Sequence, residues 1–206
     1  MDKIKVLIAD DHTLVRIGLK MLVSAQPDLE FVGEAEDGEA AVDAVNEKHP
    51  DVVVMDLQMP VLDGVGATER IRREHPETQV VILTSFCTSD GISHALDKGA
   101  IGAILKNETE TTLIQAIHFA AAGRTYIAEA IQDQIAADPP VKDLSPRQLE
   151  IISAMTRGLS NAEIAKLIGI DATTVRNHIV ALFQKLGAAN RAEAITIALR
   201  KHLLKD

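Results

Sequence analysis

The chain has 206 residues, of which 47% are hydrophobic and only 2% aromatic, and its net charge at pH 7 is −9. No apolar run reaches the length of a membrane-spanning helix, the start MDKIKVLIADD has too short an apolar run for a secretory signal, and a single cysteine excludes an internal disulfide. We therefore expect a cytoplasmic protein of one or two domains, with an aliphatic core and no membrane partner.

The charges are distributed unevenly along the chain. Residues 1–141 carry 11 basic and 24 acidic side chains, a net −13, whereas residues 142–206 carry 10 basic and 6 acidic ones, a net +4. This contrast indicates two modules, of which only the second suits a nucleic acid as a partner. A charge of +4 is equally compatible with an ordinary protein surface, so charge alone does not decide between the two interpretations.

The first part of the chain alternates strand-like and helix-like segments. Short aliphatic runs predict strands, and a segment with apolar residues at helical spacing follows each of them. Five such β-α units predict a parallel sheet with helices on both faces, for which right-handed crossovers favour the flavodoxin-like strand order 2-1-3-4-5. The expected strands are Ile4–Ala9, Leu29–Ala35, Asp51–Asp56, Gln79–Ser85 and Ile101–Lys106, and the expected helices are Thr13–Ala25, Glu39–Glu47, Val65–Glu74, Asp90–Lys98 and Glu110–Ala122.

The composition changes after this α/β region. A weak, Ala-rich helix precedes Pro139-Pro140, and two prolines end a helix and favour an extended linker. We expect a first domain over residues 1–122, a linker over 123–143 and a second domain over 144–206.

The second domain has no strand signal and is predicted to be all-α, with four helices. Ser145 is the expected N-cap of the first helix, with Pro146 at its first position. A short helix at Asn161–Ile168 and the helix within residues 171–187 are joined across Gly169, which is typical of a helix-turn-helix. A fourth helix is expected from Arg191 to about Leu203.

Carboxylates follow two strands that the expected order makes neighbours. Asp10 and Asp11 end the first strand, and Asp56 ends the third. The carboxyl ends of parallel strands lie at one edge of a sheet, so these side chains should converge there. Their mutual repulsion is costly unless a cation lies among them, and oxygen ligands with room for water suit Mg²⁺.

Two more polar groups follow the fourth and fifth strands. Thr84 supplies a hydroxyl after the fourth strand, and Lys106 supplies a positive charge after the fifth. Each group has an ordinary alternative, since Asp10 could cap a helix and a single lysine at a strand end is usually solvated. The combination over four strand ends favours a site for a phosphoryl group beside Mg²⁺.

The helix within residues 171–187 has one apolar stripe and one mixed face. On the mixed face, Arg176 suits guanine and Asn177 suits adenine in a major groove. An amphipathic helix with a solvated face is an equally good interpretation of this spacing. The side chains placed to hold phosphates are those of Thr173, Thr174, Lys185 and Arg191.

The segments IADD, MDLQMPVLDG, LTS and GAILK, in this order and spacing, resemble the receiver domain of bacterial response regulators. The resemblance implies that Asp56 accepts a phosphoryl group from a phosphohistidine of a sensor histidine kinase. It also implies that Asp10 and Asp11 are the acidic pair of a Mg²⁺ site, in which Asp11, Asp56 and the backbone carbonyl of Gln58 bind the ion.

The same resemblance implies that Thr84 and Lys106 bind the phosphoryl oxygens. One position departs from the pattern, because receivers often carry an aromatic residue three positions before the lysine and this chain has Ala103. We therefore expect switching to run through the loop after Thr84, with Phe86 involved. Cys87 in that loop is either a redox sensor or a small apolar filler.

The segment from LSPRQLEII to GAANRAEAI resembles the LuxR-type helix-turn-helix, and the whole chain resembles the NarL/FixJ family of response regulators. By this resemblance, Arg176 and Asn177 lie nearest the bases, and Lys185 and Arg191 contact phosphates. Val180 departs from regulators with a polar or basic residue at this position, and its apolar side chain suits a thymine methyl group.

The implied function is a phosphorylation-controlled transcription regulator of a two-component system, which binds promoter DNA and dimerises through residues 191–203 when phosphorylated. We expect no enzyme acting on external substrates, because one aspartate follows the third strand where a phosphatase needs a second. The alternative is a DNA-binding regulator that is independent of phosphorylation and uses its receiver as a dimerisation scaffold. The intact acidic set argues against this alternative.

Overall fold

The computed structural model describes residues 3–85, 89–137, 139–141, 144–201 and 203. The chain divides into two units, Met1–Pro139 and Pro140–Asp206, which are described separately. Phe86 and Cys87, for which switching and redox roles are expected, lie outside the described residues. Within the described part of the chain, no helix is both long and apolar enough to span a bilayer.

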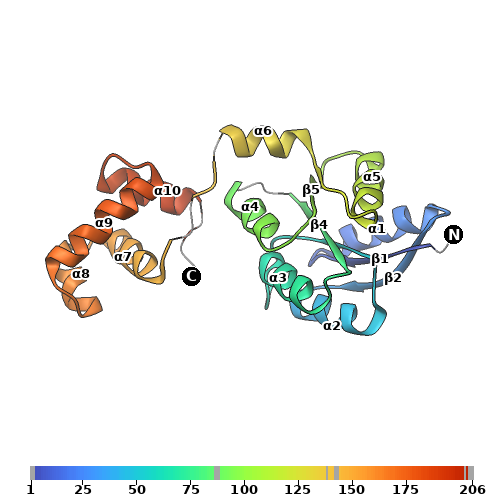
Figure 1. Ribbon diagram of the computed structural model, residues 1–206, viewed down its shortest axis with the longest axis horizontal. Coiled ribbons are helices and arrows are strands. Elements are labelled where there is room, and N and C mark those ends of the chain that lie inside the picture. The colour runs from blue at the N-terminus through green and yellow to red at the C-terminus, as the bar shows by residue number, and fades with distance from the viewer. Residues whose placement is uncertain (1–2, 86–88, 138, 142–143, 202, 204–206) are drawn as a thin grey trace. The chain divides into compact units, whose positions relative to one another are not determined.

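The first unit is built on a parallel sheet of six strands in the order β2-β1-β3-β4-β5-β6 (Figure 1). The first five strands confirm the predicted order. Aliphatic β-branched residues dominate the central strands, and all four residues of β3 are buried, as expected for a strand covered on both faces. The strands are β1 (Ile4–Ala9), β2 (Leu29–Ala35), β3 (Val52–Met55), β4 (Gln79–Thr84), β5 (Gly102–Leu105) and β6 (Tyr126–Ile127).

Helices cover both faces of this sheet, with α1 and α5 on one side and α2, α3 and α4 on the other (Figure 1). Their apolar stripes meet the strands, and the core contains no tryptophan and consists mainly of Val, Ile, Leu and Ala. The helices of this unit are α1 (Thr13–Ala25), α2 (Gly38–Lys48), α3 (Gly64–Glu74), α4 (Ser89–Asp97), α5 (Glu110–Ala121) and α6 (Glu129–Ala137).

The strand β6 and the helix α6 lie in the segment expected as a linker. Tyr126 and Ile127 pair with Gly102 and Ala103 of β5, and Ile131 of α6 is fully buried in the core of the sheet. This pairing covers the edge of β5, which would otherwise expose unpaired backbone groups. The sheet therefore has one strand more than predicted, and residues 126–137 belong to the first unit.

The second unit is a bundle of four helices, as predicted. Side-chain caps begin all four of them: Ser145 and Ser160 each form a capping box, Asp171 accepts a hydrogen bond from the Thr174 backbone, and Asn190 accepts one from the Glu193 backbone. Gly169 ends α8 in the left-handed conformation that permits the turn into α9. The helices are α7 (Pro146–Thr156), α8 (Asn161–Ile168), α9 (Ala172–Leu186) and α10 (Arg191–Arg200).

Candidate functional site

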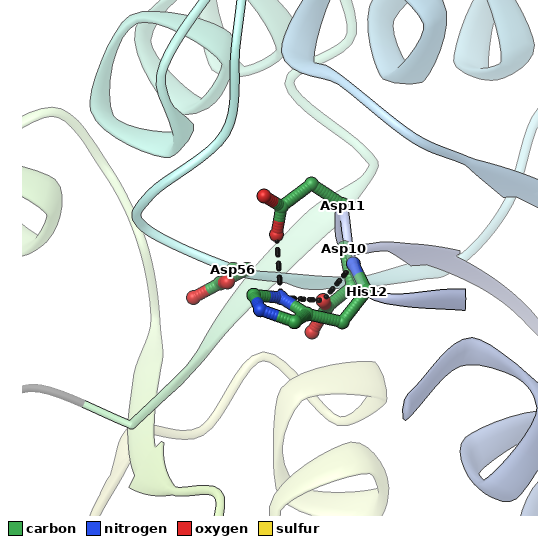
Figure 2. Close-up of side chains that lie close together, drawn as sticks. All are labelled: Asp10, Asp11, His12 and Asp56. Carbon is green, nitrogen blue, oxygen red and sulfur yellow. Dashed lines mark hydrogen bonds and ion pairs between the residues drawn. The ribbon is translucent and has the colours of Figure 1, made fainter. Parts of the chain in front are cut away.

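Acidic side chains converge at the carboxyl ends of β1 and β3. Ala9 pairs with Met55, so the next residues, Asp10 and Asp56, lie side by side, and the Asp56 N–H donates to the Ala9 carbonyl at 2.8 Å. Asp10 is 1% exposed and Asp56 is 5% exposed. Single carboxylate or imidazole atoms of Asp10, Asp11, His12 and Asp56 all lie within 4.8 Å of one another (Figure 2).

Backbone contacts fix the two buried carboxylates. One oxygen of Asp56, Oδ1, accepts the N–H of Leu57 at 2.8 Å, and Oδ1 of Asp10 accepts the N–H of His12 at 2.8 Å. The turn after β3 folds closely against the strand end. A Cβ on Gly64 would lie only 2.0 Å from the Asp56 carbonyl oxygen. This part of the chain therefore admits only glycine at position 64 without a backbone shift.

Lys106 is the counter-ion of both buried carboxylates. Its Nζ lies 2.5 Å from Asp10 Oδ2 and 2.8 Å from Asp56 Oδ2. Burial raises the pKa of Asp56 above its ordinary value, although Lys106 opposes this shift. For Lys106, burial lowers the pKa, but the two carboxylates outweigh burial and raise it. The site thus pairs a lysine and an aspartate whose pKa values are both raised above their ordinary values.

The residues at this edge fit a divalent cation. Three carboxylates face one ammonium, so negative charge remains uncompensated, and hard oxygen donors are the ligands that Mg²⁺ prefers. Gln58 is exposed two residues beyond Asp56, and its role as a carbonyl ligand stays a prediction.

Thr84 and Lys106 follow neighbouring strands and are linked through the backbone. Thr84 ends β4 and is 1% exposed. The backbone carbonyl of Thr84 accepts a hydrogen bond from the backbone N–H of Lys106 at 2.9 Å. Both residues therefore lie at the same edge of the sheet as Asp56, while their roles toward a phosphoryl group stay predictions. Ala103, three positions before Lys106, is fully buried inside β5.

The mixed face of α9 is open to solvent. Arg176, Asn177 and Val180 are exposed, and Val180 retains 51% of its accessible surface. The opposite face packs into the core of the unit through Val175, Ile179, Leu182 and Leu186. This division matches the predicted periodicity.

Three of the four predicted phosphate contacts have partners within the protein. Thr174 Oγ1 donates to Asp171 Oδ2 at 2.5 Å, and Lys185 Nζ donates to Gln148 Oε1 at 3.0 Å. Arg191 is partly buried, and one of its guanidinium nitrogens donates to the Leu159 carbonyl at 2.6 Å, between α7 and α8. Lys185 and Arg191 thus link separate segments of the bundle, the Thr174 contact is local to the start of α9, and Thr173 is exposed.

Sequence reasoning missed the side chain of His12. Its Nδ1 lies 2.7 Å from Asp11 Oδ1 and 3.3 Å from Asp10 Oδ1 (Figure 2). The signal available was its position directly after Asp10 and Asp11.

Two family models match the chain, one for each unit. Residues 6–118 match the response regulator receiver domain, and residues 142–198 match the bacterial regulatory proteins of the luxR family. Together the two matches cover most of the sequence.

Individual proteins are similar over nearly the whole chain. The oxygen regulatory protein NreC of Staphylococcus aureus strain MRSA252 is 38% identical, with 98% of this chain and 99% of that protein covered. The crystal structure of the response regulator ChrA of a heme-sensing two-component system is similar at 35% identity and a TM-score of 0.60, covering 99% of this chain and all of that one. A structure of two RcsB dimers bound to two parallel DNAs is similar at 26% identity and a TM-score of 0.70, covering 96% and 98% of the two chains.

Proposed function

Because this chain belongs to the NarL/FixJ family of response regulators, in which a receiver domain precedes a LuxR-type helix-turn-helix, we propose that phosphorylation of Asp56 controls its binding to promoter DNA. The observation that carries this proposal is the buried Asp56 carboxylate, which lies between Lys106 and the acidic pair at one edge of the sheet. The phosphoryl donor is a phosphohistidine on a sensor histidine kinase, and the protein acts in the cytoplasm.

Phosphoryl transfer uses a carboxylate oxygen of Asp56 as the nucleophile. This oxygen forms a bond to phosphorus while the phosphorus–nitrogen bond of the phosphohistidine breaks, and the bonding electron pair stays on the imidazole nitrogen. Lys106, already 2.8 Å from Asp56 Oδ2, stabilises the charge on the phosphoryl oxygens. A bound Mg²⁺ supplies further compensation of negative charge among the carboxylates and the phosphoryl group.

The added phosphoryl group changes the balance of charge at the strand ends. Lys106 now has phosphoryl oxygens to bind in addition to Asp10 and Asp56, and Thr84 can donate its hydroxyl to the same group. The Lys106 N–H is bonded to the Thr84 carbonyl, so the ends of β4 and β5 move together. Because Ala103 offers no bulky ring to rotate, the displacement acts through the ends of β4 and β5 themselves.

The DNA-binding surface is the exposed face of α9. Arg176 reads guanine, Asn177 reads adenine and Val180 contacts a thymine methyl group, while Thr173 faces a phosphate. Lys185 and Arg191 form hydrogen bonds within the second unit. Their positive charges also strengthen the attraction between this unit and the phosphate backbone of DNA.

Two copies of the second unit bind one operator when the protein is phosphorylated. A single helix in the groove reads only a short half-site, so useful affinity requires a dimer. The two copies contact each other through α10. This helix packs against its own bundle through Ala194 and Ala198, while its Leu199 is 56% exposed and available to a second copy.

Mass spectrometry after incubation with acetyl phosphate and Mg²⁺ tests the phosphorylation step. We expect one phosphoryl adduct on Asp56, which is lost in Asp56→Asn and retained in Asp43→Asn, a matched change at an exposed position of α2. An adduct on another residue, or none with this donor and with cognate kinases, would refute the proposal.

A further inference from the structure

Two histidines and a glutamate gather where β3 and β4 begin, at the opposite end of the sheet from the carboxylates that follow β1 and β3. His49 is the C-cap residue of α2 and precedes β3, while His75 is the C-cap residue of α3 and Glu77 lies between it and β4. The hydroxyl of the buried Thr78 donates to the Pro50 carbonyl at 2.8 Å. This bond fastens the two connecting segments to each other.

A hydrogen bond sets the tautomer of His75. Its Nε2 lies 2.6 Å from Oδ1 of Asn46, and because an amide oxygen can only accept, Nε2 carries the hydrogen. The neutral ring then has its lone pair on Nδ1, which lies 3.5 Å from Oε1 of Glu77. Two electron-rich atoms face each other in this arrangement, so it favours a cation beside them, either a proton on Nδ1 or a metal ion.

The imidazole of His49 supplies a third donor, which a metal ion uses and a proton does not need. The ring centroids of His49 and His75 are 6.0 Å apart. The pKa of Glu77 lies below its ordinary value, first because of its own backbone N–H and further because of both imidazoles. Two imidazoles on one Zn²⁺ have centroids about 5–6 Å apart, and tetrahedral ligand atoms lie about 3.4 Å apart. The exposed ring of His49 reaches this geometry by turning about its side-chain bonds, whereas His75 keeps only 15% of its side-chain surface exposed.

These donors are the ligands of a transition-metal site with an open position. Two imidazoles and one carboxylate bind Zn²⁺ and leave its fourth position to water, whereas sites made only of oxygen suit Mg²⁺. We propose that His49, His75 and Glu77 bind Zn²⁺, and that Asn46 positions the His75 ring by accepting its other N–H. The ion links the ends of α2 and α3, so it stabilises the first unit. Zn²⁺ binding at this end of the sheet is independent of the phosphorylation of Asp56.

NMR spectra of the imidazole nitrogens in the full chain test this site, because they follow each histidine separately during a Zn²⁺ titration. Mg²⁺ is kept in constant excess to occupy the carboxylates that follow β1 and β3. We expect the His49 and His75 resonances to shift together, with Nδ1 of His75 changing more than its Nε2. His118 is the internal control, because its Nε2 also lies 2.7 Å from a carboxylate, that of Asp28, and its resonances should stay unchanged.

Substitutions separate metal ligands from ordinary surface groups. Glu77→Gln keeps the shape of an exposed side chain and removes its charge, and His49→Asn retains a residue that tolerates the left-handed conformation of this C-cap. Each should weaken Zn²⁺ binding by at least about tenfold, as should Asn46→Ala, whereas His118→Asn should leave the affinity unchanged.

Two results would overturn the proposal. One is a response of the His49 and His75 resonances to pH but not to Zn²⁺, which would assign the cluster to a proton. The other is a Zn²⁺ affinity that is equal in the wild type, His49→Asn and Glu77→Gln.

Discussion

Replacing Lys106 with Met removes the counter-ion of two buried carboxylates. Methionine keeps most of the aliphatic stem, so the change acts mainly on the charge. Asp10 and Asp56, 1% and 5% exposed, then face each other without the ammonium group that lies 2.5 and 2.8 Å away in the wild type.

The expected loss of stability is large. Removing one partner of a buried ion pair costs about 3–5 kcal/mol, and we take about 3 kcal/mol because Lys106 keeps 12% of its side-chain surface exposed. For a unit of this size, a loss of about 3 kcal/mol lowers the melting temperature by roughly 10 °C.

The loss should also depend on pH and on Mg²⁺. Burial already raises the pKa of Asp56, and without Lys106 this pKa rises further. A carboxyl group with a higher pKa in the folded than in the unfolded state stabilises the fold as pH falls, so the deficit of Lys106→Met is smaller at pH 5 than at pH 7. A divalent cation replaces the missing positive charge, so added Mg²⁺ also reduces the deficit.

Denaturant unfolding of both proteins, in chelator and in Mg²⁺, measures these effects. The control is Lys98→Met, because Lys98 forms an exposed ion pair with Glu69 at 2.8 Å that contributes less than about 1 kcal/mol. Two results would refute the reasoning. One is an equal free energy of unfolding for Lys106→Met and Lys98→Met, and the other is a loss of stability in Lys106→Met that changes neither with pH nor with Mg²⁺.

Five further substitutions, one of them combined with a base change in the DNA, test particular contacts. Gly64→Ala should destabilise the first unit by about 2–4 kcal/mol in denaturant unfolding, because its Cβ would lie 2.0 Å from the Asp56 carbonyl oxygen. Val61→Gly should stabilise it by about 0.5–1 kcal/mol in the same assay, because the exposed Val61 has a φ of 64°. Arg191→Met should lower the unfolding free energy of the second unit by about 1–3 kcal/mol, because the Leu159 carbonyl loses its donor, whereas Arg176→Met should weaken DNA binding without this loss. Replacing the contacted thymine with uracil should weaken wild-type binding about fourfold in a filter assay and leave Val180→Ala unaffected.

Most of the fold could be predicted because strong local signals agree with the tertiary structure. The run from Val52 to Met55 is apolar throughout and forms a strand buried on both faces, and the carboxylate after it reaches the sheet edge. Ser145, Pro146 and Gly169 each mark a helix boundary by backbone chemistry that operates in any fold.

The parts that escaped prediction depend on contacts distant in sequence. The strand β6 has two residues, too few for an alternating pattern, and it forms because β5 offers an open edge and Gly102 permits close approach. The phosphate contacts of Arg191 and Lys185 stay predictions, but the sequence does not indicate that these side chains also donate to the Leu159 carbonyl and the Gln148 amide oxygen. The orientation of His12 likewise follows from the strand ends that surround it.

The affinity of the full chain for an operator duplex, with and without beryllofluoride, tests the coupling of Asp56 to DNA most directly. The duplex comes from genomic footprinting with this protein, and Mg²⁺ and salt are held constant. We expect beryllofluoride to tighten binding by at least about tenfold in wild type and in Asp43→Asn, and to have no effect in Asp56→Asn. Equal affinities of the wild type in both conditions would contradict the account and identify a regulator that binds DNA independently of phosphorylation.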